Sequence, residues 1–343
     1  MQELIDIQKK LYPDVLKIMQ QRYKLMQNVE RLQPIGRRAL ADNLNLTERH
    51  VRSDVDLLAR QGLIDMTSKG MQLTEEGNLV VDQLADYMHQ IMGLSVLEKQ
   101  LKETLKLDNI VIVPGDSDKQ TQVKQEMGKV CVGFLRENIT HSGTIAVTGG
   151  TTIAAVADMM TPFDKATCLF VPARGGIGEK EENQANTIAA KMARQANGDY
   201  RLLYVPDPLS ESSYKTMMKE PAVVEILQMI QGSDIVLHGI GDAITMAKRR
   251  KTSNEIIGKL QKEEAVSEAF GYYFNDSGDV VHKVRTIGLH LDDLSDSNHS
   301  VITIAGGTSK ARAIKSYLKQ GRSDLLITDE AAAKTILRDH HSL

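Results

Sequence analysis

Four glycine-rich segments of this chain carry hydroxyl or basic side chains at a spacing suited to anion binding. Glycines let backbone amides approach an anion closely, and hydroxyl groups and a helix N-terminus add further donors. The first and last segments each lead into an apolar helical pattern, so both are predicted to cradle phosphate, and two cradles indicate a ligand with two phosphates. The four segments are Thr148-Gly149-Gly150-Thr151-Thr152, Ala173-Arg174-Gly175-Gly176, Gly239-Ile240-Gly241 and Ala305-Gly306-Gly307-Thr308-Ser309-Lys310.

The alternative is that Gly-Gly after a strand serves only as a turn. A second hydroxyl-bearing loop, together with the basic residues Arg174 and Lys310, favours the phosphate interpretation. Arg250 belongs to the basic run 248–251, which is either a solvated face or, because it follows the Gly239–Gly241 loop closely, a source of one more phosphate contact.

Three further polar residues are candidates for binding the sugar part of such a ligand. Gln184 lies in ENQANT, Glu268 in VSEAFGYYF and His290 in GLHLDD. The alternative for Gln184 and Glu268 is a helix cap or an ordinary surface residue. His238, inside DIVLHGIG, is expected to be a hydrogen-bonded core histidine rather than a catalytic base.

A second group of residues has the spacing of a DNA-binding helix-turn-helix. The N-terminal part of the second helix of that motif reaches base edges in the major groove, while the preceding helix contacts the phosphate backbone. Arginine donates to guanine or to phosphate. A basic residue at the tip of a following hairpin would touch phosphate or the minor groove. The predicted DNA-binding residues are Arg37, Arg38, Thr47, Arg49, His50, Arg52, Ser53 and Lys69.

The elements that must position these DNA-binding residues follow from local patterns. Apolar spacing predicts a helix from about 14 to 32 after an interruption at Pro13, a short helix over 36–44, and a second helix capped by Thr47 and ending near Gly62. Gly70 lies between two short strand-like stretches, as a wing hairpin requires. A connecting helix over 75–92 then ends at Gly93. The alternative is a small helical bundle with a charged, solvated face.

The rest of the chain alternates apolar runs with helical patterns. Strands without polar alternation, separated by helices, indicate an open α/β domain with a mostly parallel sheet covered on both faces. Residues 1–92 are therefore predicted to form an N-terminal winged helix-turn-helix domain with its extension and connecting helix, and 93–343 an effector-binding domain. The predicted strands are 109–113, 144–150, 167–173, 200–206, 234–241, 300–307 and 324–329.

Composition places the chain among ordinary globular proteins. With 343 residues, 41% hydrophobic and 25% charged, it matches neither a disordered, a collagenous nor a coiled-coil sequence. No apolar run is long enough for a membrane span and the N-terminus lacks a signal-peptide core, so a soluble, cytoplasmic protein is expected. Cys131 and Cys168 lie in apolar patterns and are predicted to be buried free thiols. Residues 1–70 hold 12 Lys and Arg against 9 Asp and Glu, which puts positive charge where a polyanion would bind.

The order of the motifs resembles the SorC/DeoR family of sugar-responsive bacterial transcription regulators. The helix-turn-helix followed by TGGTT, PARGG, HGIG and AGGTSK carries this resemblance over essentially the whole chain. Within that family, the chain most resembles a branch that represses an operon of lower glycolysis. This closer resemblance is carried by the segments NQANT, SEAFGYYF and VVHKV and by the extension before PIGRR. The resemblance implies a dimer of dimers on operator DNA and fructose-1,6-bisphosphate as the allosteric ligand. The implied effector-binding residues are Gly149, Gly150, Thr151, Thr152, Arg174, Gln184, Arg250, Glu268, His290 and Lys310.

The effector domain is also similar to the sugar-phosphate isomerase and deaminase fold. Those enzymes carry a TGGTP loop and a GHIAFNEP-like catalytic stretch, where this chain has TGGTT and GIGDAITMAKRR. General acid–base catalysis needs a titrating group within hydrogen-bond reach of the substrate, and Asp242 has no partner in the sequence pattern. No catalytic residue, metal or cofactor is therefore expected. Two hypotheses remain: a transcriptional repressor that senses a phosphorylated sugar, and a sugar-phosphate isomerase or deaminase with an appended DNA-binding domain.

Overall fold

Short amphipathic helices followed by a hairpin give the first part of the chain a winged helix-turn-helix fold. The computed structural model describes residues 2–44, 46–139, 141–163, 166–177, 180–295 and 299–341, and divides into two units, Met1–Val96 and Leu97–Leu343. This division falls within one helix, a few residues after the predicted boundary at 92. The elements of the first unit are α1 (Gln2–Leu11), α2 (Pro13–Leu32), α3 (Arg37–Leu44), α4 (Glu48–Arg60), β1 (Ile64–Thr67), β2 (Gly70–Leu73), α5 (Glu75–Ile91) and the start of α6 (Leu94–Leu105).

Local sequence signals account for the ends of these helices. Pro13 occupies the first turn of α2, where a missing backbone N–H leaves no hydrogen bond unmade. The interruption predicted at Pro13 is therefore the boundary between two helices, α1 and α2. The side chain of Thr47 accepts a hydrogen bond from the amide of His50 at 3.4 Å, which confirms its predicted role as the cap of α4. Leu40, Val51 and Val55 are fully buried in the small core.

Two tertiary contacts fix the wing and the second helix of the motif, α4. Ile35 exchanges two backbone hydrogen bonds with Met71 of β2, which adds a third segment to the β1–β2 hairpin. The carboxylate of Asp54 on α4 accepts hydrogen bonds from Gln21 (2.6 Å) and Arg22 (3.0 Å) of α2. The N-terminal extension therefore braces α4 from its inner side.

The second unit is built on a seven-stranded parallel sheet, and each of the seven predicted apolar runs contributes one strand to it. The strand order is β3-β15-β14-β9-β4-β5-β7. The run predicted over 200–206 forms only the short edge strand β7, and its end joins a separate two-stranded sheet as β8. The strands are β3 (Ile110–Val113), β4 (Thr144–Val147), β5 (Leu169–Pro172), β7 (Asp199–Tyr200), β9 (Ile235–His238), β14 (Ser300–Ile304), β15 (Leu325–Asp329), and in the small sheet β6 (Gly176–Ile177) and β8 (Pro206–Asp207).

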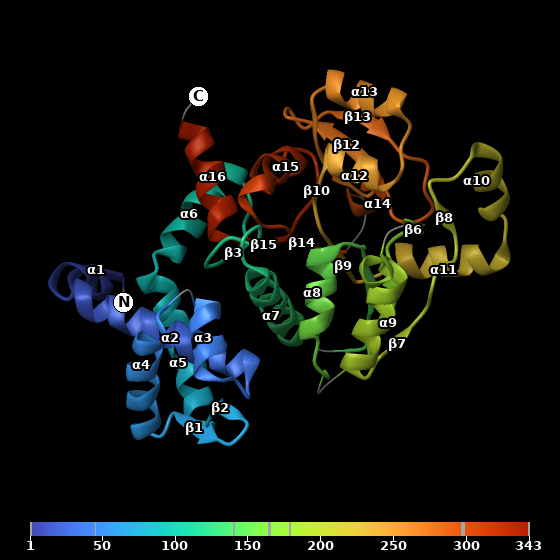
Figure 1. Cartoon of the computed structure of the whole chain (residues 1–343). Coiled ribbons are helices and arrows are strands. Elements are labelled where there is room, and N and C mark those ends of the chain that lie inside the picture. Colours follow the sequence, from blue (N-terminus) through green and yellow to red (C-terminus); the bar gives the residue numbers. More distant parts are fainter. Residues whose placement is uncertain are drawn as a thin grey trace. The chain divides into compact units, whose positions relative to one another are not determined.

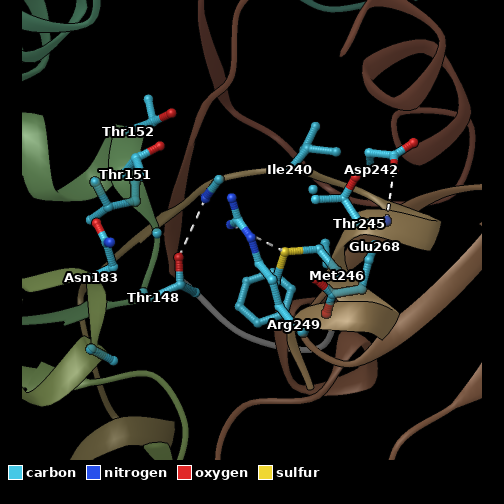
Figure 2. Close-up of a pocket in the computed structure, with 18 of the residues that line it drawn as sticks. Thr148, Thr151, Thr152, Asn183, Ile240, Asp242, Thr245, Met246, Arg249 and Glu268 are labelled. Carbon is cyan, nitrogen blue, oxygen red and sulfur yellow. Dashed lines mark hydrogen bonds between the residues drawn. The ribbon is translucent and has the colours of Figure 1, made fainter. Parts of the chain in front are cut away.

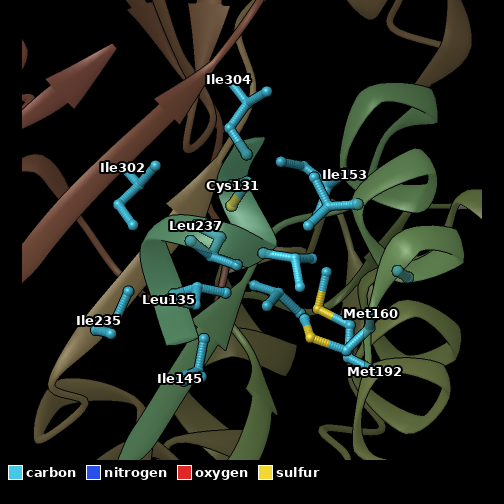
Figure 3. Close-up of a cluster of buried hydrophobic side chains, with 14 of the residues drawn as sticks. Cys131, Leu135, Ile145, Ile153, Met160, Met192, Ile235, Leu237, Ile302 and Ile304 are labelled. Atoms are coloured by element: carbon cyan, nitrogen blue, oxygen red, sulfur yellow. The ribbon is translucent and has the colours of Figure 1, made fainter. Parts of the chain in front are cut away.

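Helices cover this sheet and bury both of its faces (Figure 1). On one face, side chains of α7, α8 and α9 meet Ile145, Leu237 and Ile302 of the sheet, and Cys131 lies among them (Figure 3). Residues of alternate position, such as Val236 and Leu326, are also fully buried, so the opposite face is covered as well. Both cysteines are buried free thiols, as predicted. The helices are α7 (Thr121–Asn138), α8 (Thr151–Met159), α9 (Ala185–Ala196), α10 (Glu211–Met217), α11 (Pro221–Gln231), α14 (Leu291–Ser295), α15 (Ala311–Tyr317) and α16 (Glu330–His341), with short 3-10 turns η1 (Glu181–Asn183) and η2 (Thr308–Lys310).

The chain segment that follows β9 and precedes β14, orange in Figure 1, forms an antiparallel four-stranded sheet. This sheet was not predicted from the sequence. Its hairpin turns at Phe270 and Gly271, both at positive φ (53° and 82°), a geometry that suits a two-residue turn. The apolar run around this turn therefore doubles back on itself instead of joining the parallel sheet. The insertion consists of β10 (Gly241–Asp242), α12 (Ala243–Arg249), α13 (Asn254–Lys262), β11 (Ala265–Ala269), β12 (Tyr272–Asn275) and β13 (Val280–Lys283).

The strand order places one pair of loops where open α/β sheets bind ligands. The strands β4, β5 and β7 follow one another toward one edge of the sheet. The next strand along the chain, β9, lies on the other side of β4 and pairs with it in parallel. The sheet order thus switches direction between β4 and β9, and the loops that follow these two strands part at that point. Across the described ranges, no helix is long and apolar enough to cross a membrane.

Candidate functional site

A pocket of about 260 Å³ opens at the switch point between β4 and β9 (Figure 2). We call it the switch-point pocket. Threonines of the loop after β4 lie on one side, and Asp242 and Thr245 lie on the other. It is lined by Lys124, Thr148, Gly149, Gly150, Thr151, Thr152, Ile153, Arg174, Gly175, Asn183, Gln184, Ala185, Gly239, Ile240, Gly241, Asp242, Thr245, Met246, Arg249, Arg250, Glu268, Ala269, Phe270, Ser309 and Lys310.

The loop after β4 has the backbone that the sequence predicts for an anion cradle. Gly150 caps α8 at φ 121°, and a side chain on Gly149 would lie 2.7 Å from the carbonyl oxygen of Asn183. Both positions therefore require glycine. The first-turn amides of α8 have no partners within the helix, so they and the hydroxyls of Thr151 and Thr152 are available at the pocket wall.

The loops on the two sides of the switch point are joined by a side-chain hydrogen bond. The amide of Gly239 donates to Oγ1 of Thr148 over 3.3 Å, as the dashed line in Figure 2 shows. Together with the backbone bond from the amide of Thr148 to the carbonyl oxygen of Leu237 at 3.0 Å, this bond holds the β4 and β9 loops close together at the floor of the pocket. A ligand that contacts one loop is therefore presented to the other in a set geometry.

Arg174, Arg250 and Glu268 meet at the pocket wall in one buried charge network with Asp207. Arg250 donates to Glu268 (2.7 Å) and to the hydroxyl of Tyr273 (2.9 Å). Arg174 pairs with Asp207 and lies 3.5 Å from the Glu268 carboxylate. Two arginines and two carboxylates balance one another, so the network is electrically neutral before any ligand enters.

Both partners of the central pair are held in their charged forms. Burial alone would raise the pKa of Glu268, but the guanidinium groups of Arg250 and Arg174 and the amide of Gly271 lower it below its ordinary value. Burial likewise works against the charge of Arg250, and the adjacent Glu268 carboxylate raises the pKa of that guanidinium. Glu268 is thus a permanent hydrogen-bond acceptor at the pocket wall, a suitable partner for sugar hydroxyls.

A second set of basic groups, Lys124, Arg249 and Lys310, lines the pocket apart from this network. We call these three residues the cationic cluster. Within the described ranges, the side-chain amine of Lys310 makes no hydrogen bond or ion pair, whereas its backbone amide donates to the carbonyl oxygen of Gly307 at 3.1 Å. Burial, followed by the positive charges of Lys124 and Arg249, lowers the pKa of Lys310 to about 8. An anion placed among the three would relieve their mutual repulsion.

The loop after β14 differs from the expected backbone cradle. Its Ser309 donates both its amide (2.7 Å) and its hydroxyl (3.0 Å) to Asp118, and Thr308 donates to Asp116 (3.1 Å). Of the six residues from 305 to 310, Ser309 and Lys310 line the pocket. An internal carboxylate therefore occupies the donors that the sequence assigns to phosphate, and the positive charge of Lys310 is what this loop brings to the site.

The structure brings nine of the ten predicted effector-binding residues to this pocket, and His290 lies elsewhere. His290 borders a second hollow, with Tyr214, Leu227 and Gly288 among its neighbours. The segment that carries it pairs with Arg174 through a backbone bridge at Gly288, and His290 is not among the residues that line the switch-point pocket. His238 is fully buried and within 2.8 Å of Thr303, which confirms a core histidine; burial lowers its pKa to about 4.

Several residues of the site were not singled out from the sequence. Lys124 and Asn183 lie on elements whose local pattern gives no sign of a pocket, and Asp207 and Asp118 act on Arg174 and Ser309 across long stretches of chain. Asp242 caps α12 by accepting a hydrogen bond from the amide of Thr245 at 2.8 Å. The one carboxylate considered for acid–base chemistry thus has a structural role. Within the described ranges, no cluster of His, Cys, Asp and Glu could hold a metal ion.

The predicted DNA-binding residues form an exposed face of the first unit. Arg49, His50, Arg52 and Ser53 are exposed on α4, and Lys69 is exposed at the turn of the wing. Arg52 lies 3.5 Å from Glu48 in a solvent-exposed pair, which DNA phosphate can replace at little cost.

Two of the remaining predicted DNA-binding residues, Arg37 of α3 and Thr47, already have partners within the protein. Arg37 pairs with Asp56 of α4 at 2.7 Å, whereas its neighbour Arg38 is exposed. Thr47 is exposed but serves as the cap of α4, so its hydroxyl is already bonded to His50.

Comparisons with known proteins agree with this division of roles. Residues 18–88 match the model of a "CggR N-terminal DNA binding domain", and residues 89–338 match that of a "Putative sugar-binding domain". The chain is 51% identical to the "Central glycolytic genes regulator" of Priestia megaterium over 99% of both chains, and 50% identical to that of Bacillus subtilis over 99% of this chain and 100% of the relative.

Solved structures show the same likeness. A SorC family transcriptional regulator from Enterococcus faecalis is 44% identical, with a TM-score of 0.67 over 70% of this chain and 99% of that one. The full-length sorbitol operon regulator of Klebsiella pneumoniae shares the fold at 17% identity, with a TM-score of 0.63 over 94% of this chain and 99% of that one.

Proposed function

Because the chain belongs to the SorC family of sugar-binding transcription regulators, in the branch of the central glycolytic genes regulators, we propose that it is a repressor released from its operator by fructose-1,6-bisphosphate. It regulates transcription of glycolytic genes and is not an enzyme. The observation that carries the proposed ligand is the pairing of two anion-binding features in one pocket, the glycine loop before α8 and the cationic cluster.

Each part of a sugar bisphosphate has a partner in this assignment. One phosphate is bound by Gly149, Gly150, Thr151 and Thr152, and the other by Lys310 with Lys124 and Arg249. Arg174, Arg250 and Glu268 contact the sugar between them, and Gln184 borders the same space. A monophosphate would satisfy only one of the two anion-binding features and is expected to bind more weakly.

The operator is bound by the exposed face of α4 and the wing. Arg49, His50, Arg52 and Ser53 read the major groove, while Arg37, Arg38 and Lys69 contact phosphates and Thr47 holds the start of the helix. We place the protein in the cytoplasm and expect a dimer of dimers on DNA, because a symmetric oligomer matches repeated half-sites. The ligand acts by binding one arrangement of the effector domains better than another.

Two measurements on the purified protein test this function. Calorimetric titration with fructose-1,6-bisphosphate, fructose 6-phosphate and glucose 6-phosphate measures affinity, and a product assay on the same samples checks for turnover. Fluorescence anisotropy with DNA from upstream of its glycolytic operon then measures operator release. Tight bisphosphate binding without product, together with release, is expected. DNA binding that no sugar phosphate alters would reject the proposed effector.

A further inference from the structure

The loop between β3 and α7 places two carboxylates against the loop after β14. Asp118 accepts two hydrogen bonds from Ser309, one on each carboxylate oxygen, across 191 residues of sequence. Asp116 accepts one from the amide of Asp118 at 3.0 Å and one from the hydroxyl of Thr308 at 3.1 Å. The two acids therefore hold consecutive residues of the β14 loop, immediately before Lys310.

The glycines of the β14 loop are explained by this contact. A side chain on Gly307 would lie 2.4 Å from a carboxylate oxygen of Asp118, and one on Gly306 would lie 2.7 Å from Asp329. Asp329 in turn accepts a hydrogen bond from the amide of Ser117 at 2.8 Å. Glycine is required here so that carboxylates of the same chain can approach, not so that phosphate can.

This arrangement holds the backbone next to Lys310, whereas the amine of Lys310 makes no hydrogen bond or ion pair among the described residues. Lys310 lines the switch-point pocket directly after Ser309, whose amide and hydroxyl are both bound by Asp118. Its long side chain has many rotamers, so the position of its backbone decides how often the amine lies where an anion can use it. A restrained backbone lowers the cost of ordering the amine when ligand binds.

We propose that Asp118 is a positioning residue for the effector, which by binding Ser309 places Lys310 in the pocket and so selects a sugar bisphosphate over a monophosphate. This inference rests on the proposed sugar-phosphate site. A carboxylate close to an anion-binding site repels the anion, so this repulsion predicts that removing Asp118 strengthens binding. Positioning predicts that removing it weakens binding. Asp118 also raises the pKa of Lys310, so the affinities are compared at a pH well below that pKa, where the amine stays charged.

The test compares D118A and D118N with the wild type by calorimetry, using fructose-1,6-bisphosphate and fructose 6-phosphate. D118A is expected to weaken bisphosphate binding about tenfold, since two hydrogen bonds to a charged acceptor are lost. Monophosphate affinity should change less, so the preference for the bisphosphate falls. D118N keeps one acceptor oxygen for Ser309 and should lie between D118A and the wild type.

Two further variants separate positioning from a general effect on the fold. Asp276→Ala removes another exposed carboxylate, one that accepts a hydrogen bond from Arg312 on α15, and should leave both affinities unchanged. In a K310M background, D118A should weaken bisphosphate binding no further, because the group that it positions is gone. If D118A does not fold, D118N and Ser309→Ala provide the same comparison.

The outcomes are distinct. Unchanged or tighter bisphosphate binding by folded D118A, with normal wild-type binding, overturns the role of Asp118 and leaves the proposed function intact. A loss of the same size in the K310M background also overturns it, because Asp118 would then act independently of Lys310. A wild-type protein that binds neither sugar phosphate overturns the proposed function and this inference together.

Discussion

Arg250 donates a hydrogen bond to Glu268 over 2.7 Å, and both side chains are almost fully withdrawn from solvent at the wall of the switch-point pocket. The same carboxylate oxygen accepts the amide of Gly271 at 2.7 Å, so it holds the turn between β11 and β12 as well. Pairing inside the protein neutralises the arginines in advance, and a ligand meets a fixed acceptor and fixed donors at this wall. The net positive charge that attracts an anion comes from the cationic cluster instead.

Glu268→Gln tests how much this buried network contributes to the free energy of unfolding. The substitution keeps the size of the side chain but leaves two buried guanidinium groups with one carboxylate, and breaking such a pair costs about 3–5 kcal/mol of unfolding free energy. Denaturant unfolding of the second unit measures it. Asp276→Ala, at an exposed ion pair, should cost less than about 1 kcal/mol. Equal costs for the two variants would contradict a dominant role for the buried pair.

The same network makes stability depend on pH. The folded pKa of Glu268 lies below its ordinary value near 4.5, so its contribution is complete above that value and is lost as pH falls through the folded pKa. Unfolding free energy of the wild type should therefore drop in acid more steeply than that of Glu268→Gln. Parallel acid profiles for the two proteins would remove Glu268 as the cause.

Lys310 gives effector binding a pH dependence at the alkaline side. Burial and the neighbouring cations lower its pKa to about 8, so the amine loses its charge as pH rises through that value, whereas the phosphates keep theirs. Affinity for fructose-1,6-bisphosphate should fall between about pH 7 and 9. Calorimetry on Lys310→Met should show weaker binding and a flat profile over this interval; a wild-type profile that is already flat would refute the assignment.

Thr152→Val tests the glycine loop before α8. Thr152 is 5% exposed and lines the pocket, so the isosteric change removes one hydroxyl donor with little effect on packing. Affinity for the bisphosphate should fall by about 1–3 kcal/mol, with operator affinity unchanged in the absence of ligand. Thr216→Val, at an exposed threonine of α10, is the matched control. An effector response that survives Thr152→Val intact would show that this loop does not bind phosphate.

Arg52→Ala tests the DNA-binding face, and it should lower operator affinity while leaving effector affinity unchanged. Its side chain is 60% exposed and, among the described residues, makes only a surface pair with Glu48, so stability should hardly change. If Arg52 contacts a base, the binding free energy for the operator should weaken by about 1–3 kcal/mol. If it contacts a phosphate, the slope of log affinity against log salt concentration should become shallower by about one. Lys24→Ala, an exposed lysine of α2, serves as the control. Anisotropy titrations that show no difference would remove Arg52 from the interface.

The sequence by itself determined the elements and the loops that could bind anions. Continuous apolar runs predicted all seven strands of the parallel sheet, and Thr47, Gly70 and the helical spacing around them predicted the winged helix-turn-helix. These signals are local, since a helix cap, a turn glycine or a buried strand is specified within about ten residues. For the same reason, residue type and spacing were enough to make Thr151, Thr152 and Glu268 candidates for the site.

Only the tertiary structure decided which of those candidates meet and what already occupies them. Asp118 binds Ser309 across 191 residues, Arg174 pairs with Asp207 as well as lying close to Glu268, and His290 lines another hollow. The order of strands in the sheet sets each of these contacts, and that order arises from burial summed over the whole domain. Glycine patterns show where a backbone must come close to something, but only the packed sheet shows whether that partner is a phosphate or a carboxylate of the same chain.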